Sequence, residues 1–357
     1  MWLGAPPSSD GGAGRTLHDV TNLPTDAFGR ELRDLRLSVT DRCNMRCRYC
    51  MPREVFGPDH AFLERDELLS FEELTRVVTA AARLGVRKVR LTGGEPLLRR
   101  GLPELVAMLR DVPGIEDLAL TTNGVLLPTH APALRGAGLT RVTVSLDAMD
   151  DETFAAVTDA PYRVDQVLAG MDAAEAEGFP PCKINAVVRR GVNEHAIVDL
   201  ARHGRETGRT VRFIEFMDVG TTNGWDRDEV VAADEVLTAI SEHWEVEPID
   251  GEPGVAERYR YLDGAGEVGV IASVTRAFCR TCVRARISAV GELYTCLFAS
   301  SGTDLRPLIR DGASVDDLEQ RLAALWGVRD DRYSLDRARQ RASGEDDDKV
   351  EMSYIGG

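Results

Sequence analysis

LRLSVTDRCNMRCRYC, residues 35–50, places a candidate β-strand directly before three cysteines. Leu35, Leu37 and Val39 alternate with polar residues, which is the period of a strand with one apolar and one polar face. The polar face of such a strand can line a cavity. The cysteines follow with three and then two residues between them, so a compact loop carries three thiols. This stretch predicts a cavity-lining strand that leads into a metal or redox loop.

Strand-like runs recur along the first part of the chain. They lie at 86–92, 118–122, 142–146, 183–188 and 211–217. Helical patterns separate them, at 71–84, 103–109, 164–177 and 194–206. Ser70 and Glu73 form a capping box before the first of these helices. Strands that alternate with helices predict parallel βα units, hence an α/β sheet curved into a partial or complete barrel, with functional loops at the strands' C-terminal ends.

The pattern changes beyond about residue 220. One helical pattern lies at 232–243, and short strand patterns follow around 258–262, 269–274 and 286–297. This predicts a smaller region with mixed or antiparallel strands. The expected organisation is a flexible N-terminal arm at 1–30, a barrel at 31–220, a smaller α+β region at 221–341, and an acidic segment with a Gly-Gly tail at 342–357.

Composition and charge limit the class of protein. Of the 357 residues, 43% are hydrophobic and 29% charged, a globular mixture that excludes fibrous, collagenous and wholly disordered chains. The net charge of -16 opposes nonspecific binding to nucleic acid or anionic membrane, so an anionic ligand must meet a local basic pocket. No apolar run approaches the roughly 20 residues of a membrane span. The N-terminus lacks the features of a secretory signal, so we expect a cytoplasmic protein.

Cys43, Cys47 and Cys50 are suited to an iron–sulfur cluster. Three thiolates in one short loop can hold three corners of a 4Fe–4S cubane and leave the fourth iron open to a chelating ligand. The alternative is a zinc site completed by a histidine, of which the nearest in sequence is His60. Cys182, by contrast, has no partner at metal-ligand spacing and is expected to be a small buried structural thiol.

A second group consists of Cys279, Cys282 and Cys296. A hairpin that turns at residues 291–292 could bring the third cysteine back beside the first two. The alternative to a second cluster is a zinc knuckle with an unidentified fourth ligand. Arg284 and Arg286 stand two residues apart on a strand, hence on one face, where they suit a polyanionic ligand or form a solvated surface.

These features resemble the radical S-adenosylmethionine (SAM) enzymes. That superfamily has three cysteines at this spacing, an aromatic residue before the third, here Tyr49, and a glycine-rich turn, here Gly93-Gly94-Glu95-Pro96. The resemblance implies that Cys43, Cys47 and Cys50 bind a 4Fe–4S cluster whose open iron takes SAM. It also implies that an electron from this cluster cleaves SAM to a 5'-deoxyadenosyl radical.

The two cysteine groups together closely resemble the GTP 3',8-cyclase family of molybdenum cofactor biosynthesis. The shared segments are 36–44, 91–96, 278–282, Arg284, Arg286 and the terminal Gly356-Gly357. The resemblance implies a partial (β/α)6 TIM-type barrel, closed by a C-terminal α+β region that carries an auxiliary 4Fe–4S cluster on Cys279, Cys282 and Cys296. The implied reaction is radical SAM cyclisation of GTP to (8S)-3',8-cyclo-7,8-dihydroguanosine 5'-triphosphate, in which hydrogen is taken from C3' of the ribose.

The same resemblance assigns roles to individual positions. GTP contacts are implied for Arg36, Arg90, Thr121, Lys183, Arg284, Ala285 and Arg286. SAM contacts are implied for Tyr49, Gly94, Ser145 and Met217. Catalytic roles are implied for Arg284, Arg286, Gly356 and Gly357, the two glycines by reaching into the active site. Because the chain has no G-x4-G-K-[ST] phosphate loop, side-chain cations must hold the triphosphate.

The implied partners are GTP as substrate, an electron donor, a cyclic pyranopterin monophosphate synthase that receives the product, and a second copy in a homodimer. Nucleic acid and membrane are not expected. Two alternative functions stay open. Another radical SAM enzyme with an auxiliary cluster, such as a peptide modifier, would cleave SAM without converting GTP. A non-catalytic iron–sulfur protein would carry clusters that ignore SAM.

Overall fold

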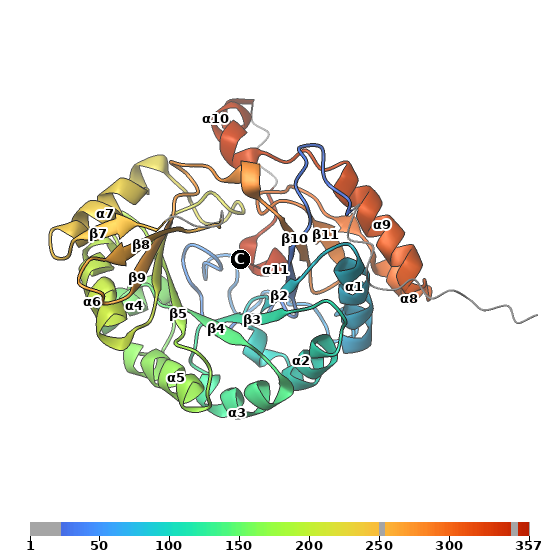
Figure 1. The fold of residues 1–357 in the computed structure, drawn as a ribbon, viewed down its shortest axis with the longest axis horizontal. Helices are drawn as coiled ribbons and strands as arrows, with labels where there is room; N and C mark the ends of the chain where they lie inside the picture. The colour runs from blue at the N-terminus through green and yellow to red at the C-terminus, as the bar shows by residue number, and fades with distance from the viewer. Residues whose placement is uncertain (1–22, 250–253, 344–348, 357) are drawn as a thin grey trace, which may run out of the picture.

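The computed structural model describes residues 23–249, 254–343 and 349–356. Its central sheet contains β1 (Asp34–Ser38), β2 (Lys88–Thr92), β3 (Asp117–Thr122), β4 (Arg141–Ser145), β5 (Lys183–Val188) and β6 (Val211–Glu215). Each strand pairs in parallel with the next one along the chain. The six predicted strands and their parallel order are confirmed, and together they curve around a central space (Figure 1).

Strands from the C-terminal region extend this sheet at both edges. β9 (Glu267–Ile271) pairs in parallel with β6, and β10 (Arg284–Ile287) pairs in parallel with β1. The remaining strands are antiparallel to their neighbours: β7 (Val246–Pro248), β8 (Glu257–Tyr261), β11 (Glu292–Tyr294) and β12 (Thr303–Asp304). In the described part of the chain the sheet has twelve strands and does not close on itself. The predicted partial barrel with mixed strands after it is confirmed.

Most helices cover the outer face of the sheet, whereas the short C-terminal helix Met352–Ile355 lies inside its curve (Figure 1). The α-helices are α1 (Phe71–Arg83), α2 (Leu102–Arg110), α3 (Leu127–Ala137), α4 (Asp151–Thr158), α5 (Val164–Ala176), α6 (Ile197–Thr207), α7 (Ala233–Ser241), α8 (Arg306–Arg310), α9 (Val315–Gly327), α10 (Tyr333–Ser343) and α11 (Met352–Ile355). Short 3-10 turns are η1 (Pro96–Leu98), η2 (Glu194–Ala196), η3 (Arg227–Glu229) and η4 (Cys279–Thr281). The predicted capping box of Ser70 and Glu73 begins α1. None of the described helices is long and apolar enough to cross a bilayer.

Sequence patterns miss α3 and α4 among the outer helices. Pro128 lies in the first turn of α3 and Pro132 lies inside it, and proline within a helix normally removes a hydrogen bond and ends the pattern. Tertiary packing overrides this preference, because α3 buries Leu127, Ala131 and Leu134 against the sheet.

The apolar core lies between the sheet and its helices. Leu37, Leu91 and Leu120 are completely buried there. Because side chains alternate along a strand, Arg36 and Arg90 on the neighbouring positions point to the opposite, inner face. The interior of the barrel is consequently polar and charged, as the alternation in residues 35–39 predicts.

Residues 23–30 do not behave as the flexible arm predicted from the sequence. Asp26 and Arg30 are each only 5% exposed, and the indole Nε1 of Trp326 donates a hydrogen bond of 2.9 Å to the carbonyl of Arg30. Buried ion pairs and this contact hold the segment against the C-terminal region. The rest of the predicted arm, residues 1–22, and most of the acidic stretch, residues 344–348, lie outside the described residues.

Candidate active site

A cavity of about 290 Å³ lies inside the curve of the sheet. Inward-facing residues from all six central strands line it, together with residues of the C-terminal region. All six clustered cysteines are part of this lining: Cys43, Cys47, Cys50, Cys279, Cys282 and Cys296. None of them forms a disulfide. The two cysteine groups, more than 200 residues apart in the chain, therefore share one site.

The first cysteine loop follows β1 and is shaped by its own backbone. The amide of Cys50 donates a hydrogen bond of 2.9 Å to the carbonyl of Cys47, and Arg46 Nη1 donates one of 2.8 Å to the carbonyl of Cys43. Burial, and then the charge of Glu95, raises the pKa of Cys43 to about 11. Burial also raises the pKa values of Cys47 and Cys50. Metal binding would release these protons, because thiolates are the ligands.

The donor set of this loop fits an iron–sulfur cluster better than a zinc ion. Among the described residues no histidine lines the cavity, so the histidine that a zinc site would need is missing from its wall. In the same residues, no three His, Cys, Asp or Glu side chains are grouped closely enough to hold a single metal ion. In a cubane, each thiolate binds a different iron, so three free thiols of one loop that line one cavity suit it.

The glycine turn after β2 packs directly against the residues that precede Cys43. The amide of Gly94 donates a hydrogen bond of 2.9 Å to the carbonyl of Thr40, and a Cβ on Gly93 would lie 2.3 Å from the same oxygen. A Cβ on Gly94 would lie 2.3 Å from the carbonyl of Arg42. Gly93 also has φ of 141°, which side chains disfavour. Only glycine permits this close approach of two loops at the cavity.

All four predicted SAM-contact residues line the cavity: Tyr49, Gly94, Ser145 and Met217. The hydroxyl of Tyr49 donates a hydrogen bond of 3.0 Å to the carboxylate of Asp147. The other oxygen of Asp147 accepts one of 2.8 Å from the amide of Val187. Burial raises the pKa of Asp147 to about 6. Asp147, which the sequence analysis does not single out, thus fixes the orientation of Tyr49.

Glu95 is a second buried carboxylate of the lining. It accepts hydrogen bonds from the amides of Leu97 and Asn123, at 2.9 and 2.8 Å, and from the hydroxyl of Thr122 at 2.8 Å. Burial raises its pKa to about 7. The sequence shows Glu95 only as part of a turn motif; its place inside the cavity is what suits it to a cationic group of a ligand.

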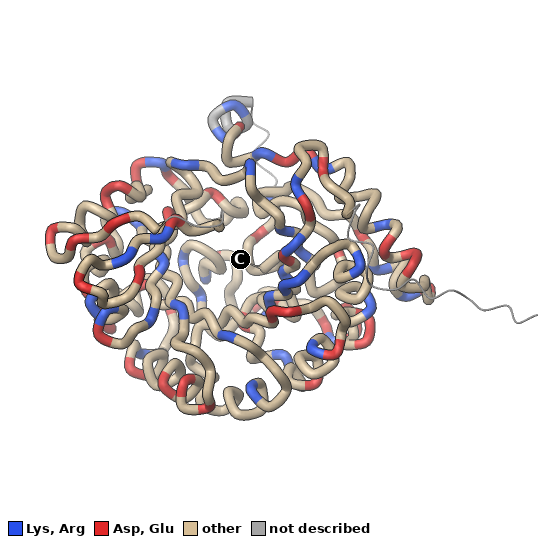
Figure 2. Tube along the Cα trace, viewed as in Figure 1, with Lys and Arg blue, Asp and Glu red and all other residues tan. Residues whose placement is uncertain are grey.

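Besides Glu95, the cavity lining contains arginines on strands β1, β2, β6 and β10. Arg36, Arg90, Arg212, Arg284 and Arg286 all line the cavity. Burial, and then neighbouring cations, lowers the pKa of Arg36 to about 9 and those of Arg90 and Arg212 to about 10. Figure 2 shows basic residues on the inner strands, whereas many acidic residues lie on the outer helices. A chain of net charge -16 thus surrounds a local cationic pocket.

Several donors of these arginines have no protein partner. Nε of Arg36, Nε of Arg212 and Nη2 of Arg286 are buried and make no hydrogen bond within the described residues. Buried polar groups are nearly always hydrogen-bonded in folded proteins. Buried guanidinium donors without partners, on residues that line one cavity, consequently suit a polyanionic ligand. No motif marks Arg212 in the sequence, although its inward position follows from the strand alternation at 211–217.

The other predicted GTP contacts differ in position. Arg90 Nη1 donates a hydrogen bond of 3.0 Å to the hydroxyl of Thr121, which also lines the cavity. Lys183 and Ala285 are not part of the lining. Lys183 shares the inner face of β5 with Asn185, a lining residue, but lies two residues earlier, at the start of the strand. Ala285 lies in the apolar core.

The second cysteine group is assembled by the predicted hairpin. β10 and β11 are antiparallel, and Gly291 turns between them with φ of 97°. This returns Cys296 toward Cys279 and Cys282 at the same cavity. Although burial opposes it, the charges of Arg284 and then Arg329 lower the pKa of Cys282 to about 6.

The C-terminal tail enters the same site. Met352 of α11 lines the cavity, and Arg286 Nε donates a hydrogen bond of 3.3 Å to the carbonyl of Gly356. Gly357, for which a catalytic role is predicted, lies outside the described residues. Upstream, Lys349 Nζ donates to the carbonyl and the carboxylate of Asp218, at 2.9 and 3.1 Å. These contacts hold the tail at the end of β6.

Two family models match successive parts of the chain. Residues 37–204 match the Radical SAM superfamily, and residues 209–335 match the family described as Molybdenum Cofactor Synthesis C. The first match contains Cys43, Cys47, Cys50 and the glycine turn, and the second contains Cys279, Cys282 and Cys296.

Curated relatives match nearly the whole chain. A GTP 3',8-cyclase of Acidothermus cellulolyticus is 55% identical over 95% of this chain and 100% of its own length. A GTP 3',8-cyclase of Staphylococcus carnosus is 47% identical over 93% of this chain and 98% of its own length. Among solved structures, histidine-tagged anSMEcpe with bound AdoMet matches 60% of this chain and 58% of that chain, at 16% identity and a TM-score of 0.48.

Proposed function

The chain belongs to the GTP 3',8-cyclase family of the radical SAM superfamily, and from that membership we propose how its cavity serves the reaction. The activity is the radical SAM cyclisation of GTP to (8S)-3',8-cyclo-7,8-dihydroguanosine 5'-triphosphate in molybdenum cofactor biosynthesis. The cofactors are two 4Fe–4S clusters and SAM. The observation that supports our site assignment is that two three-cysteine groups and several unpaired buried guanidinium donors line one cavity.

Cys43, Cys47 and Cys50 hold the first cluster in this proposal, and Cys279, Cys282 and Cys296 hold the second. When bound, the first cluster and SAM supply a radical that can take hydrogen from the ribose of GTP. The protein's part is to orient the ligands and to exclude water. Tyr49, Gly94, Ser145 and Met217 contact SAM, and Asp147 orients Tyr49 through the hydroxyl hydrogen bond.

GTP occupies the cationic side of the cavity in this proposal. The free donors of Arg36, Arg212 and Arg286 bind the triphosphate, and Arg90 acts with Thr121. Arg284, two positions before Arg286 on the same face of β10, is next to Cys282 and aligns the substrate with the second cluster. Fixing GTP at both ends restricts which ribose atom faces SAM, an orientation effect that can contribute about 7–11 kcal/mol.

Lys183 and Ala285, which do not line the cavity, can still contact GTP as follows. Lys183 has its pKa lowered by burial and then by Arg212, so an incoming phosphate would stabilise its charge. Since the side chain of Ala285 lies in the core, only its backbone can face GTP, between Arg284 and Arg286. Gly356 acts through the tail contact with Arg286, and the role of Gly357 stays a prediction from family membership.

The remaining partners are predictions from family membership. We expect an electron donor, transfer of the product to a cyclic pyranopterin monophosphate synthase, homodimer formation and a cytoplasmic location. The barrel at 31–220 and the auxiliary region at 221–341 are the proposed functional units, and their strands share one sheet.

The function is tested by anaerobic incubation of reconstituted protein with GTP, SAM and a reductant, followed by mass analysis of the nucleotides. We expect the cyclised dihydro-GTP and 5'-deoxyadenosine in equal amounts. SAM cleavage without a GTP product would favour another radical SAM enzyme. Clusters that do not respond to SAM would favour a non-catalytic iron–sulfur protein.

A further inference from the structure

Arg329 contacts the backbone of two of the three segments that carry the second cysteine group. Its Nη1 donates a hydrogen bond of 3.0 Å to the carbonyl of Cys282. Its Nε donates one of 3.1 Å to the carbonyl of Thr295, the residue before Cys296. The Arg329 side chain is only 2% exposed and is also part of the cavity lining. One guanidinium thus joins both sides of the hairpin directly at the thiol positions.

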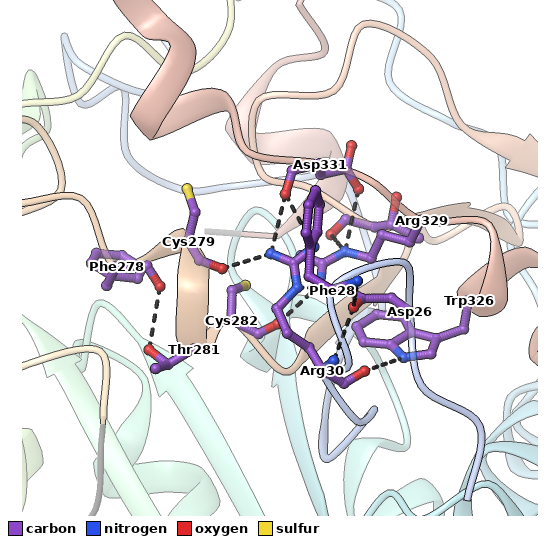
Figure 3. A network of polar contacts seen from close by, with 11 residues as sticks. Asp26, Phe28, Arg30, Phe278, Cys279, Thr281, Cys282, Trp326, Arg329 and Asp331 are labelled. Atoms are coloured by element: carbon purple, nitrogen blue, oxygen red, sulfur yellow. Dashed lines mark hydrogen bonds and ion pairs between the residues drawn. The ribbon is translucent and has the colours of Figure 1, made fainter.

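Arg30 contacts the third segment from the opposite end of the chain. Its Nη1 donates hydrogen bonds of 2.6 Å to the carbonyl of Cys279 and 3.1 Å to the carbonyl of Asp331 (Figure 3). Its side chain is 4% exposed. The two arginines together contact the backbone at or next to all three cysteines.

Asp26 joins these two arginines. Its carboxylate is completely buried, and Oδ2 lies 2.5 Å from Arg30 Nε and 2.9 Å from Arg329 Nη1. Its Oδ1 accepts hydrogen bonds of 2.9 Å from the amides of Phe28 and Arg30. Asp26 therefore joins the two guanidinium groups, and Asp331, whose Oδ2 lies 3.3 Å from Arg329 Nε, shares in balancing their buried charge (Figure 3). We call Asp26, Arg30 and Arg329 the carbonyl clamp.

We propose that the carbonyl clamp positions the three thiols of the second cluster, which rests on the proposed assignment of that cluster to Cys279, Cys282 and Cys296. Groups that hydrogen-bond around a metal site orient its ligands, and their loss typically lowers metal affinity about 10- to 100-fold. A segment near residue 26, remote in sequence from both cysteine motifs, accordingly controls retention of the second cluster and not of the first.

If the carbonyl clamp acted only on general stability, its loss would affect both clusters. A positioning role predicts that only the second cluster is affected. No residue of the carbonyl clamp hydrogen-bonds to residues 43–50, whose loop is held by Arg46 and by its own backbone. The first cluster is an internal control in every measurement, because reductive SAM cleavage without GTP depends on it alone.

The test compares Arg329→Lys, Arg30→Lys and Asp26→Asn with the parent protein and with Arg332→Lys as a matched control. Arg332 lies on the same loop, but its side chain is 47% exposed and its carboxylate partner is Asp336. Its guanidinium also lies over the ring of Phe28, a cation–π contact that lysine can keep, so Arg332→Lys leaves the clamp contacts in place. Each reconstituted protein is exposed anaerobically to an iron chelator, and iron loss, the EPR spectrum with and without GTP, SAM cleavage and the unfolding temperature are recorded. We expect the clamp variants to lose the iron of the second cluster about 10- to 100-fold faster, with SAM cleavage as in the parent. Arg332→Lys should match the parent.

Two results would overturn the clamp while leaving the proposed function intact: parent-like iron loss and EPR spectra in all three clamp variants, or loss of both clusters together with a lowered unfolding temperature. A parent protein that binds only one cluster would instead overturn the proposed second site itself. Arg329→Lys keeps the charge but lacks the planar guanidinium that bridges two carbonyls. Faster loss of the second cluster's iron in this variant would therefore show that the hydrogen-bond geometry, and not the charge, is required.

Discussion

The carbonyl oxygen of Gly356 accepts a hydrogen bond from Nε of Arg286, a residue 70 positions earlier in the chain. Arg286 is only 2% exposed, and its Nη2 has no partner within the described residues. One guanidinium therefore both contacts the tail and carries an unpaired donor. A ligand that binds Nη2 must lie beside the tail, so Arg286 would couple the position of the tail to that of such a ligand.

Gly356→Ala is expected to reduce product formation strongly while the fold is retained. The backbone of Gly356 has φ of 74°, and an added Cβ would lie 2.0 Å from Oγ1 of Thr92. Displacing the tail by about 1 Å from its place at Arg286 can cost on the order of 100-fold in turnover. Gly136→Ala, where an added Cβ meets nothing within 4 Å, is the control. Product formation, iron content and unfolding temperature are measured; parent-like turnover in Gly356→Ala would contradict the role of the tail.

Deleting Gly356 and Gly357 should abolish the product while cluster content and unfolding temperature stay nearly unchanged. The four-residue helix α11 precedes the deletion, and its buried Ile355 keeps the rest of the tail in place. A deletion variant with full activity would show that the terminal glycines are dispensable. One that loses both clusters would show that they serve folding instead.

Lys349→Met is expected to release the tail. Lys349 is buried and donates to the carbonyl and carboxylate of Asp218, and hydrogen bonds to charged groups contribute about 1.5–3 kcal/mol each. Carboxypeptidase digestion of the folded protein, followed by intact mass analysis, should show faster trimming than in the parent. Arg339→Met, at a 75% exposed side chain on α10, is the control. Equal trimming in Lys349→Met and the parent would rule out this anchor.

Arg212→Ala is expected to weaken GTP binding by about 1.5–3 kcal/mol with little change in SAM binding. The reason is that Arg212 lines the cavity and its buried Nε has no partner among the described residues. Lys183→Ala should act in the same direction. Calorimetry with GTP and with SAM distinguishes the two ligands, and Arg202→Ala, an exposed arginine on α6, is the control. Unchanged GTP affinity in both cavity variants would contradict the placement of the triphosphate.

Replacement of Arg212 by Met should not destabilise the ligand-free protein. Burial, and then Arg141, lowers the pKa of Arg212 to about 10. A base whose pKa falls on folding binds its proton less tightly in the native state, so at neutral pH the charged side chain lowers the free energy of unfolding. Thermal unfolding without ligand should give an equal or higher midpoint. A large fall in the midpoint would identify Arg212 as a structural residue.

The cysteine groups should be separable by substitution. Reconstituted parent protein should hold about eight irons, as two cubanes. Replacing Cys43, Cys47 and Cys50 together should remove SAM cleavage and leave one cluster, whereas replacing Cys279, Cys282 and Cys296 should remove GTP conversion but leave SAM cleavage. Zinc at the second group after reconstitution would contradict the two-cluster assignment.

The sequence predicts those features whose signal is local. The alternation at 183–188 coincides with β5, and the capping box of Ser70 and Glu73 begins α1 as expected. The cysteine spacing and the glycine turn are local as well, which is why the site could be expected before its geometry was known. α3 is missed because Pro132 lies within it, and its stability comes from packing.

Features that depend on residues distant in the chain cannot be predicted from local sequence patterns. Asp26 and Arg329 are 303 positions apart, and no sequence pattern near either residue predicts their buried ion pair. For the same reason residues 23–30 are mistaken for an arm. Arg212 is one arginine among many in an arginine-rich chain, and only its burial without a partner identifies it as a ligand-binding candidate.

GTP deuterated at C3' of the ribose tests whether this cavity holds GTP with its ribose facing the SAM end, between the residues around Tyr49 and the arginines around Arg286. The protein is incubated anaerobically with SAM, a reductant and the labelled GTP, and 5'-deoxyadenosine and the cyclised nucleotide are analysed by mass. We expect deuterium from C3' to appear in 5'-deoxyadenosine as the product forms. Continued formation of the product with no deuterium in 5'-deoxyadenosine would contradict this placement of GTP.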